Sequence, residues 1–161
     1  MSNKLELNRR NLMVGAGLAA TAFAAGATQA QAEANTTAPD LTGKSILITG
    51  CSSGFGRLGA EHYARLGAKV FATMRNLPRP EADELTALAA SENLAITVIE
   101  IDVTSDEQVE AGVAEALAAS GGTIDVLINN AGIAFAGPIE VQDMEATQLI
   151  FNTNVFGPQR M

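Results

Sequence analysis

The stretch Thr49-Gly50-Cys51-Ser52-Ser53-Gly54-Phe55-Gly56 decides the fold of this 161-residue chain. It follows an apolar run at 45–48 and precedes a segment with helical periodicity, which predicts a strand-to-helix turn. The three glycines let the backbone turn sharply, let an anion approach the amides and leave room for the helix to pack on the strand. Because the positive end of the helix dipole would face that anion, we predict a phosphate-binding turn. The competing interpretation is a tight glycine-rich loop.

Apolar, β-type runs alternate with amphipathic segments along the rest of the chain. The expected strands span residues 45–49, 69–74, 95–101 and 124–128, and the expected helices span 54–66, 81–92, 104–120 and 141–156. Strands that alternate with helices favour parallel pairing with right-handed crossovers. The sequence therefore predicts an α/β fold, a Rossmann-like doubly wound parallel sheet with about four strands in the order 3-2-1-4.

Spacing within two of these helices gives finer expectations. Phe55, Leu58 and Leu66 recur at helical spacing in the first helix. Thr104 and Glu107 have the spacing of a capping box, which predicts that the third helix begins there.

Composition bounds the class of protein. The content of 47% apolar residues and the net charge of −8 indicate one soluble globular domain and exclude a disordered chain. The acidic excess argues against nucleic acid or an anionic membrane surface as the partner. The single cysteine, Cys51, allows no internal disulfide, and the lack of a Cys/His cluster argues against a metal site.

Residues 1–32 have the composition of a targeting segment. Basic residues precede the apolar stretch 12–27, and a small-x-small end at 30–32 favours cleavage after Ala32. Arg9-Arg10-Asn11-Leu12-Met13 resembles the twin-arginine export motif of bacteria. We therefore expect a signal peptide at 1–32, a linker at 33–41, a domain at 42–161 and a periplasmic or secreted protein. The alternative is an uncleaved leader that serves as a membrane anchor, although the apolar stretch is shorter than the ~20 residues of a spanning helix.

Several motifs together resemble the short-chain dehydrogenase/reductase family. They are the T-G-x-x-x-G-x-G turn, Asp102-Val103, Asn129-Asn130-Ala131-Gly132 and Asn154, and the resemblance runs from about Gly43 to the last residue. It implies an NAD(P)-dependent oxidoreductase that interconverts an alcohol and a carbonyl on a small molecule, with a homo-oligomer plausible for the full-length protein. The alternative is a nucleotide-binding module without catalysis.

The end of the second expected strand bears on the choice of cofactor. An acidic residue there would accept hydrogen bonds from the 2′-hydroxyl of the adenosine ribose and repel a 2′-phosphate. This chain has Met74 and Arg75 instead, and in family members that use NADP an arginine commonly stands at that place. Ser53 matches a serine that adds a donor in relatives with this form of the turn. We therefore expect NADP rather than NAD, with a solvated loop arginine as the alternative.

The resemblance assigns roles to the remaining motifs. Asp102 and Val103 match the family's adenine contact, with a helix-capping turn as the competing account of Asp102. Asn130 is expected to be structural first, and the Ala131-Gly132 backbone to pass near the nicotinamide ribose. Asn154 matches a catalytic asparagine whose backbone helps to hold a water, with a local kink or cap as the alternative.

The family's general acid/base has no counterpart in this sequence. That group is a tyrosine followed four residues later by a lysine, whereas Tyr63 is followed at that spacing by Gly67. We therefore expect the chain to be the amino-terminal half of a longer reductase, with an incomplete sheet and no turnover of its own.

Overall fold

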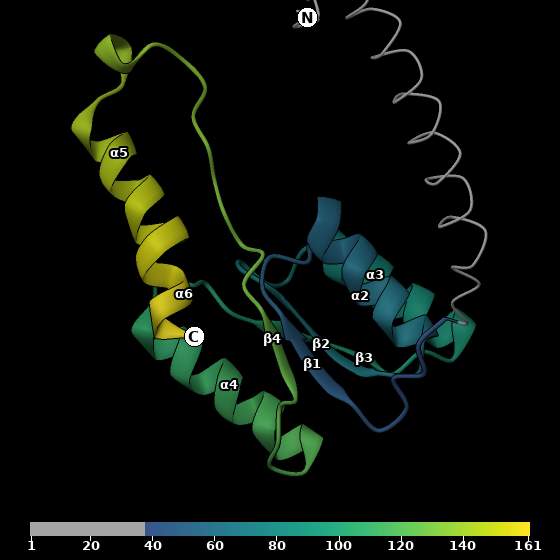
Figure 1. The fold of residues 1–161 in the computed structure, drawn as a ribbon. Helices are drawn as coiled ribbons and strands as arrows, with labels where there is room; N and C mark the ends of the chain where they lie inside the picture. The colour runs from purple at the N-terminus through teal and green to yellow at the C-terminus, as the bar shows by residue number, and fades with distance from the viewer. Residues whose placement is uncertain (1–37) are drawn as a thin grey trace, which may run out of the picture. The chain divides into compact units, whose positions relative to one another are not determined.

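Among the residues that the structure describes, four parallel strands form one sheet in the order β3-β2-β1-β4 (Figure 1). The strands are β1 (Ser45–Ile48), β2 (Lys69–Met74), β3 (Ile96–Glu100) and β4 (Val126–Ile128). In register, Leu47 of β1 lies opposite Phe71 of β2 and Leu127 of β4. The predicted doubly wound parallel sheet and its strand order are therefore confirmed.

The structure is a computed structural model that describes residues 38–161. Residues Asp40–Met161 form one compact unit. The predicted signal peptide and most of the predicted linker lie outside the described residues. Within the described part of the chain, no helix has both the length and the apolar character needed to cross a membrane.

Helices cover both faces of the sheet (Figure 1). They are α2 (Gly54–Arg65), α3 (Pro80–Glu92), α4 (Asp106–Ser120), the 3-10 turn η1 (Ile139–Val141), α5 (Met144–Phe151), the π turn η2 (Asn152–Phe156) and α6 (Gly157–Arg160). The helices α2 and α3 pack on one face, and α4 packs on the other.

Two apolar clusters hold these layers together, because side chains alternate along each strand. Ile46 and Val70 face the cluster that contains Ala60 of α2 and Leu85 of α3. Leu47, Phe71 and Ile99 face the opposite cluster, where they meet Val109 and Ala116 of α4. The central strands β1 and β2 therefore contribute side chains to both clusters and are buried on both faces of the sheet.

The buried face of α2 differs from the apolar pattern in its sequence. Phe55 is 88% exposed and Leu58 is 62% exposed. The residues that face the sheet are Gly56, Ala60 and Ala64. Large apolar residues at helical spacing therefore identified the helix but not its buried face, which carries small residues instead.

The predicted capping box at the start of α4 was wrong by one residue. Ser105 is the N-cap, and its Oγ accepts a hydrogen bond from the Gln108 amide at 3.3 Å. The Thr104 hydroxyl is engaged elsewhere, because it donates to Asp102 Oδ1 at 2.7 Å. Ser105 and Gln108 have the same spacing as the predicted pair and form the cap instead.

The predicted last helix was also wrong at both ends. Val141, the expected first residue, is the last residue of the separate 3-10 turn η1, and α5 begins after Asp143, whose Oδ1 accepts from the Ala146 amide at 2.6 Å. At the other end, the chain stays helical through Pro158 to Arg160. The π turn η2 ends directly before Gly157-Pro158, so the proline stands in the first turn of α6, where a missing N–H is tolerated.

Candidate functional site

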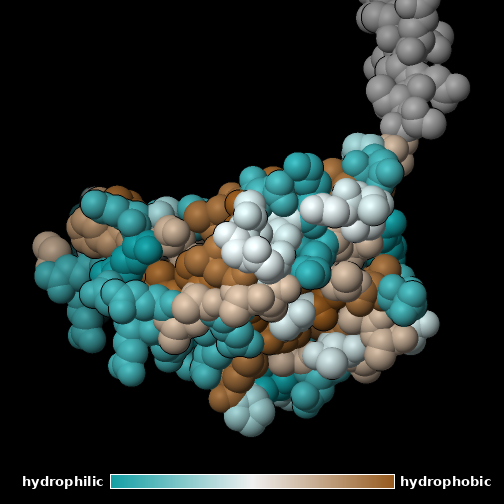
Figure 2. All heavy atoms as spheres, turned by 90° about the horizontal axis from the view of Figure 1, so that it is seen from below, coloured by the Kyte–Doolittle hydropathy of each residue, from teal (hydrophilic) through white to brown (hydrophobic). Residues whose placement is uncertain are grey.

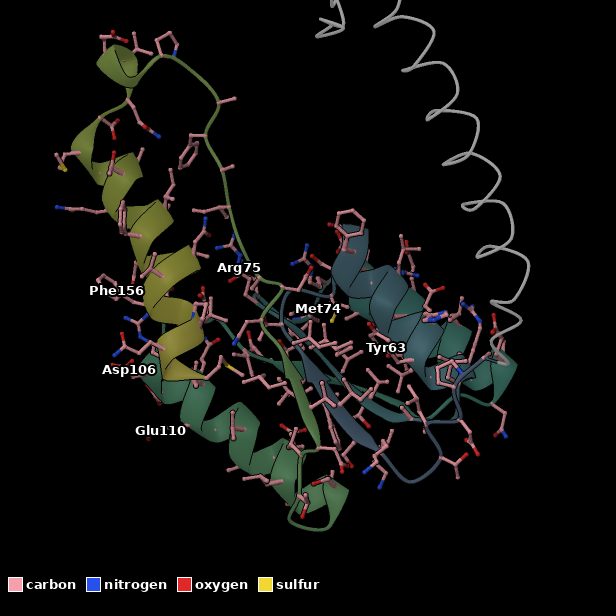
Figure 3. The ribbon with its side chains drawn as sticks, in the orientation of Figure 1. Tyr63, Met74, Arg75, Asp106, Glu110 and Phe156 are labelled. Atoms are coloured by element: carbon pink, nitrogen blue, oxygen red, sulfur yellow. The ribbon has the colours of Figure 1, made fainter. Side chains whose placement is uncertain are left out.

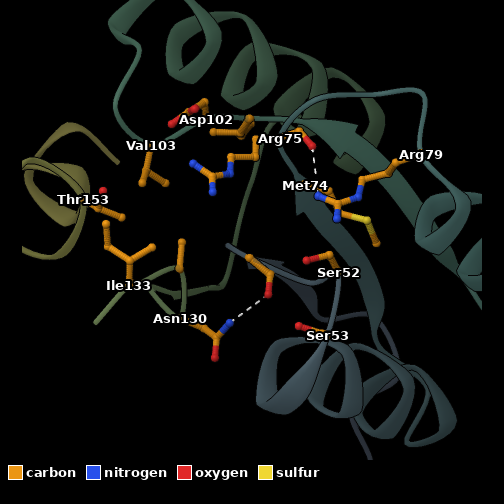
Figure 4. A pocket seen from close by; sticks show the side chains of 14 residues that line it. Ser52, Ser53, Met74, Arg75, Arg79, Asp102, Val103, Asn130, Ile133 and Thr153 are labelled. Atoms are coloured by element: carbon orange, nitrogen blue, oxygen red, sulfur yellow. Dashed lines mark hydrogen bonds between the residues drawn. The ribbon is translucent and has the colours of Figure 1, made fainter. Parts of the chain in front are cut away.

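A cavity of about 310 Å³ opens at the carboxyl ends of the strands (Figure 4). In open α/β sheets, ligands bind in the crevice outside these ends, where the strand order reverses. The order β3-β2-β1-β4 reverses between β1 and β4, and the segments that follow both strands line the cavity. Its lining residues are Gly50, Ser52, Ser53, Met74, Arg75, Arg79, Ile101, Asp102, Val103, Asn130, Ala131, Gly132, Ile133 and Thr153.

Most of the residues singled out in the sequence meet in this cavity. Gly54, Phe55 and Gly56 do not line it, and they form the first turn of α2 beside it. Asn154 does not line it either, although its neighbour Thr153 does. Tyr63 lies on α2 outside the lining, whereas Arg75 directly follows β2 and lines the cavity (Figure 3).

The cavity also contains residues that the sequence reasoning missed. They are Arg79, Ile101, Ile133 and Thr153, and Met74, which the sequence analysis noted only as the neighbour of Arg75, also lines the cavity. Ile101 directly precedes Asp102-Val103, and Ile133 directly follows Ala131-Gly132. Their place beside these motifs could have predicted that they line the cavity. Arg79 lies four residues beyond Arg75, in a loop whose path the sequence did not predict.

The glycines of the β1–α2 turn have distinct physical roles. Gly50 and Gly54 adopt positive φ angles of 72° and 58°, which L side chains rarely adopt. A Cβ at Gly56 would lie 2.4 Å from both the Gly50 carbonyl oxygen and Asn130 Nδ2. The first two glycines therefore permit the turn, and the third permits the close approach of α2 to the segment after β4.

The amino end of α2 is open to an anion. Its N-cap, Ser53, makes no side-chain capping hydrogen bond, and its first turn carries no acidic residue. The other long helices, α3 and α4, both carry acidic residues in the first turn. The free amides and the positive dipole end of α2 thus have no competing carboxylate on their own turn.

A network around Thr49 and Asn130 fixes this turn to the segment after β4. Asn130 Nδ2 donates to the carbonyl oxygens of Thr49 at 2.9 Å and Gly50 at 3.0 Å. Thr49 Oγ1 accepts from the amides of Asn130 at 3.0 Å and Ala131 at 2.9 Å. The Asn130 amide group therefore holds two neighbouring loops in place, as its expected structural role requires.

The Asp102 carboxylate is engaged within its own loop. Its Oδ1 accepts hydrogen bonds from the Thr104 amide at 2.9 Å and from the Thr104 hydroxyl. The Asp102 amide donates to Gln108 Oε1 at 2.8 Å. These contacts fit the capping-turn account, and the adenine contact stays a prediction.

Asn154 joins the π turn to the segment after β4. Its Oδ1 accepts from the Ile133 amide at 2.9 Å, and its Nδ2 donates to the Ile133 carbonyl at 2.8 Å. Pro158, four residues on, has no N–H to donate to the Asn154 carbonyl. Single π turns are frequent at functional sites, and the catalytic role of Asn154 stays a prediction.

Cys51 is buried directly after the first glycine of the turn, and it is not a nucleophile there. Its amide donates to the Thr73 carbonyl at 2.8 Å, and its Sγ donates to the Ile48 carbonyl at 3.2 Å. Burial raises the pKa of the thiol to about 12. The protonated thiol therefore packs the turn against β2.

The two arginines of the cavity differ in their partners. Within the described residues, the Arg75 guanidinium has no hydrogen-bond acceptor or ion-pair partner; in Figure 4 it extends toward Val103. Arg79 is held by a carboxylate, Glu81. Among the described residues, Arg75 is therefore the arginine of this cavity whose guanidinium has no carboxylate partner.

Comparisons with known proteins agree with this geometry. Residues 44–161 match the family described as short chain dehydrogenase. Human retinol dehydrogenase 8 is 41% identical over 123 residues, which are 73% of this chain and 37% of that protein. This chain therefore spans well under half the length of that relative.

Solved structures show the same arrangement. A blue fluorescent protein from a metagenomic library, in complex with NADPH, has a TM-score of 0.68 and 30% identity over 75% of this chain and 49% of its own. A gluconate 5-dehydrogenase from Burkholderia cenocepacia J2315, in complex with NADP and tartrate, has a TM-score of 0.66 and 31% identity over 74% of this chain and 46% of its own. On these matches, the chain belongs to the short-chain dehydrogenase family.

Proposed function

We propose that the cavity binds NADP as the cofactor of an oxidoreductase that interconverts an alcohol and a carbonyl on a small molecule. The observation that carries this proposal is the Arg75 guanidinium, which lines the cavity directly after β2 without a partner among the described residues. An acidic residue at this place would favour the 2′-hydroxyl of NAD, and none lines the cavity there. A guanidinium instead forms paired, charge-assisted hydrogen bonds with a phosphate.

The other lining residues fit the rest of the dinucleotide. The open amino end of α2 suits the diphosphate, because its amides are free of a side-chain cap. Asp102, Val103, Ala131 and Gly132 also line the cavity, and we expect the first two to contact the adenine and the last two to pass near the nicotinamide ribose. When bound, NADP supplies or accepts the hydride. The residues described here bind and orient it, and Asn154 holds the π turn against Ile133 beside the cavity.

Arg75→Ala tests the cofactor assignment. We expect the variant to bind NADP about tenfold more weakly, since hydrogen bonds to charged groups contribute ~1.5–3 kcal/mol, and to bind NAD with unchanged affinity. Arg65→Ala is the matched control, because Arg65 forms ion pairs with Glu61 and Glu92 and does not line the cavity. Equal NADP affinity in the Arg75 variant and the wild type would rule the assignment out.

We also propose that the protein is exported through the twin-arginine route. The support is the sequence of residues 1–32, which combines Arg9-Arg10 with an apolar stretch and a small-x-small end. This route carries folded proteins, so the cofactor could be captured before export. Replacement of both arginines by lysine should stop export of a tagged protein, and unchanged export would contradict the proposal.

A further inference from the structure

Arg79 lines the same cavity as Arg75 but is held by a carboxylate. Its Nε donates to Glu81 Oε2 at 2.9 Å, and its Nη2 donates to Glu81 Oε1 at 3.1 Å. Its Nη1 donates to the Arg75 carbonyl at 3.2 Å, the contact drawn as a dashed line in Figure 4. The guanidinium is therefore fixed by a bidentate ion pair on one side and by the backbone of the Arg75 loop on the other.

These contacts leave donors free on Arg79. They use one N–H of each nitrogen, so the second N–H of Nη1 and the second N–H of Nη2 remain for another acceptor. Glu81 itself does not line the cavity. The carboxylate thus binds the guanidinium from outside and leaves the face toward the cavity available.

Glu81 stays ionised over the whole physiological range. The hydrogen bonds from Arg79 lower the pKa of the Glu81 carboxyl to about 2, and the charge of Arg57 acts in the same direction. Arg57 Nη1 also donates to the Glu81 carbonyl at 3.4 Å, and Glu84 pairs with Arg57. Near neutral pH, Glu81 therefore offsets part of the positive charge that Arg79 presents to the cavity.

We propose that Arg79 is a second ligand of the cofactor's 2′-phosphate and that Glu81 tunes the cavity's preference between the phosphorylated and unphosphorylated dinucleotides. This inference rests on the proposed binding of NADP. A phosphate has more acceptor oxygens than one guanidinium can satisfy, and Arg79 presents its spare donors from the loop that also carries Arg75. The Glu81 carboxylate weakens the attraction for the phosphate, because like charges repel over this range.

Removal of the Glu81 charge has two opposing effects. It loosens Arg79, which weakens phosphate binding, and it removes a repulsion, which strengthens phosphate binding. Loss of the ion pair loosens Arg79, but the glutamine keeps one side-chain oxygen that accepts from the guanidinium, and the hydrogen bond to the Arg75 carbonyl remains. Loss of the Glu81 negative charge also removes a repulsion on the phosphate, which carries nearly two negative charges at pH 7. The charge effect is larger, so Glu81→Gln strengthens phosphate binding.

The test compares adenosine 2′,5′-bisphosphate with adenosine 5′-monophosphate, titrated into the full chain by calorimetry. We expect Arg79→Gln to weaken binding of the bisphosphate about tenfold and to leave the monophosphate unchanged. We expect Glu81→Gln to strengthen binding of the bisphosphate about threefold. Arg65→Gln and Glu84→Gln are the matched controls, because each removes an ion-paired charge of the same sign outside the cavity.

The outcomes separate this inference from the proposed function. If Arg75→Ala abolishes the preference for the bisphosphate and Arg79→Gln does not, the inference is overturned while NADP binding stands. Weaker or unchanged bisphosphate binding in Glu81→Gln overturns the tuning role. If the wild type shows no preference for the bisphosphate, the proposed function fails and the inference fails with it.

Discussion

The strands β2 and β4 are both mostly apolar but have very different surroundings. Both are short apolar runs that suit the interior of a sheet. In β2 every residue after Lys69 is buried, whereas in β4 Val126 and Leu127 are 42% and 41% exposed. The difference comes from position, because β2 lies between β1 and β3 and β4 lies at the edge of the described sheet. Composition predicts a strand, and neighbours decide its burial.

The helices show the same contrast. Val109 and Ala116 of α4 are buried against the sheet, whereas Phe151, Val155 and Phe156 are exposed. An apolar hollow of about 650 Å³ lies along α5 and η2. On the face shown in Figure 2, apolar patches lie among hydrophilic side chains. We infer that stability resides mainly in β1, β2 and the helices packed on them, and that α5 and η2 contribute little to it.

The largest effect is expected in the centre of the sheet. Phe71→Ala removes a completely buried ring from the cluster between β2 and α4. We expect the free energy of unfolding to fall by about 3–5 kcal/mol, from lost burial and a residual cavity, measured by urea denaturation. A loss below about 1 kcal/mol would contradict the inference that stability resides mainly in β1, β2 and the helices packed on them.

The junction between the two regions should show an intermediate effect. Asn130→Ala removes both donors to the Thr49 and Gly50 carbonyls, and it should lower the free energy of unfolding by about 1–3 kcal/mol. The neighbouring Asn129 is exposed, so Asn129→Ala is the control. Equal losses in the two variants would show that the network does not join the loops.

The thiol of Cys51 reports on the integrity of the turn beside β2. Because burial raises its pKa to about 12, Cys51 should react with a thiol reagent at pH 8 only after denaturant is added. Its contribution to stability is fully present below the ordinary pKa of 9.0 and is lost as pH rises from there toward about 12. Rapid labelling of the native protein at pH 8 would show that the turn is open.

The smallest effect is expected on α5 and its π turn. Phe156→Ser replaces a half-exposed ring, and the free energy of unfolding should change by no more than about 0.5 kcal/mol. The same urea titration serves as the measurement. A loss comparable to that of Phe71→Ala would mean that the apolar hollow contributes to the stability of the core.

Much of the fold could be predicted from the sequence, because strand and helix periodicities alternate and the glycine turn marks the first crossover. Local competition could not be predicted. Ser105 rather than Thr104 caps α4, and the Thr104 hydroxyl is hydrogen-bonded to Asp102 instead. Phe55 is exposed because the face of α2 that packs on the sheet carries Gly56, Ala60 and Ala64, and periodicity alone does not decide which face is buried.

The candidate site divides in the same way. The motifs at 50–56, 102–103 and 130–132 were visible because each directly follows a strand, and parallel strands place their carboxyl ends at one edge. Arg79 was missed because its place in the cavity depends on the path of the loop from Arg75 to α3 and on the ion pair with Glu81. Neither the loop path nor the ion pair follows from residue spacing.

Parallel titration of NADPH and NADH into the full chain, followed by nicotinamide fluorescence, tests the central claim most directly. We expect NADPH to bind at least about tenfold more tightly than NADH, through charge-assisted hydrogen bonds to the 2′-phosphate. Equal affinities, tighter binding of NADH, or binding of neither nucleotide would contradict it.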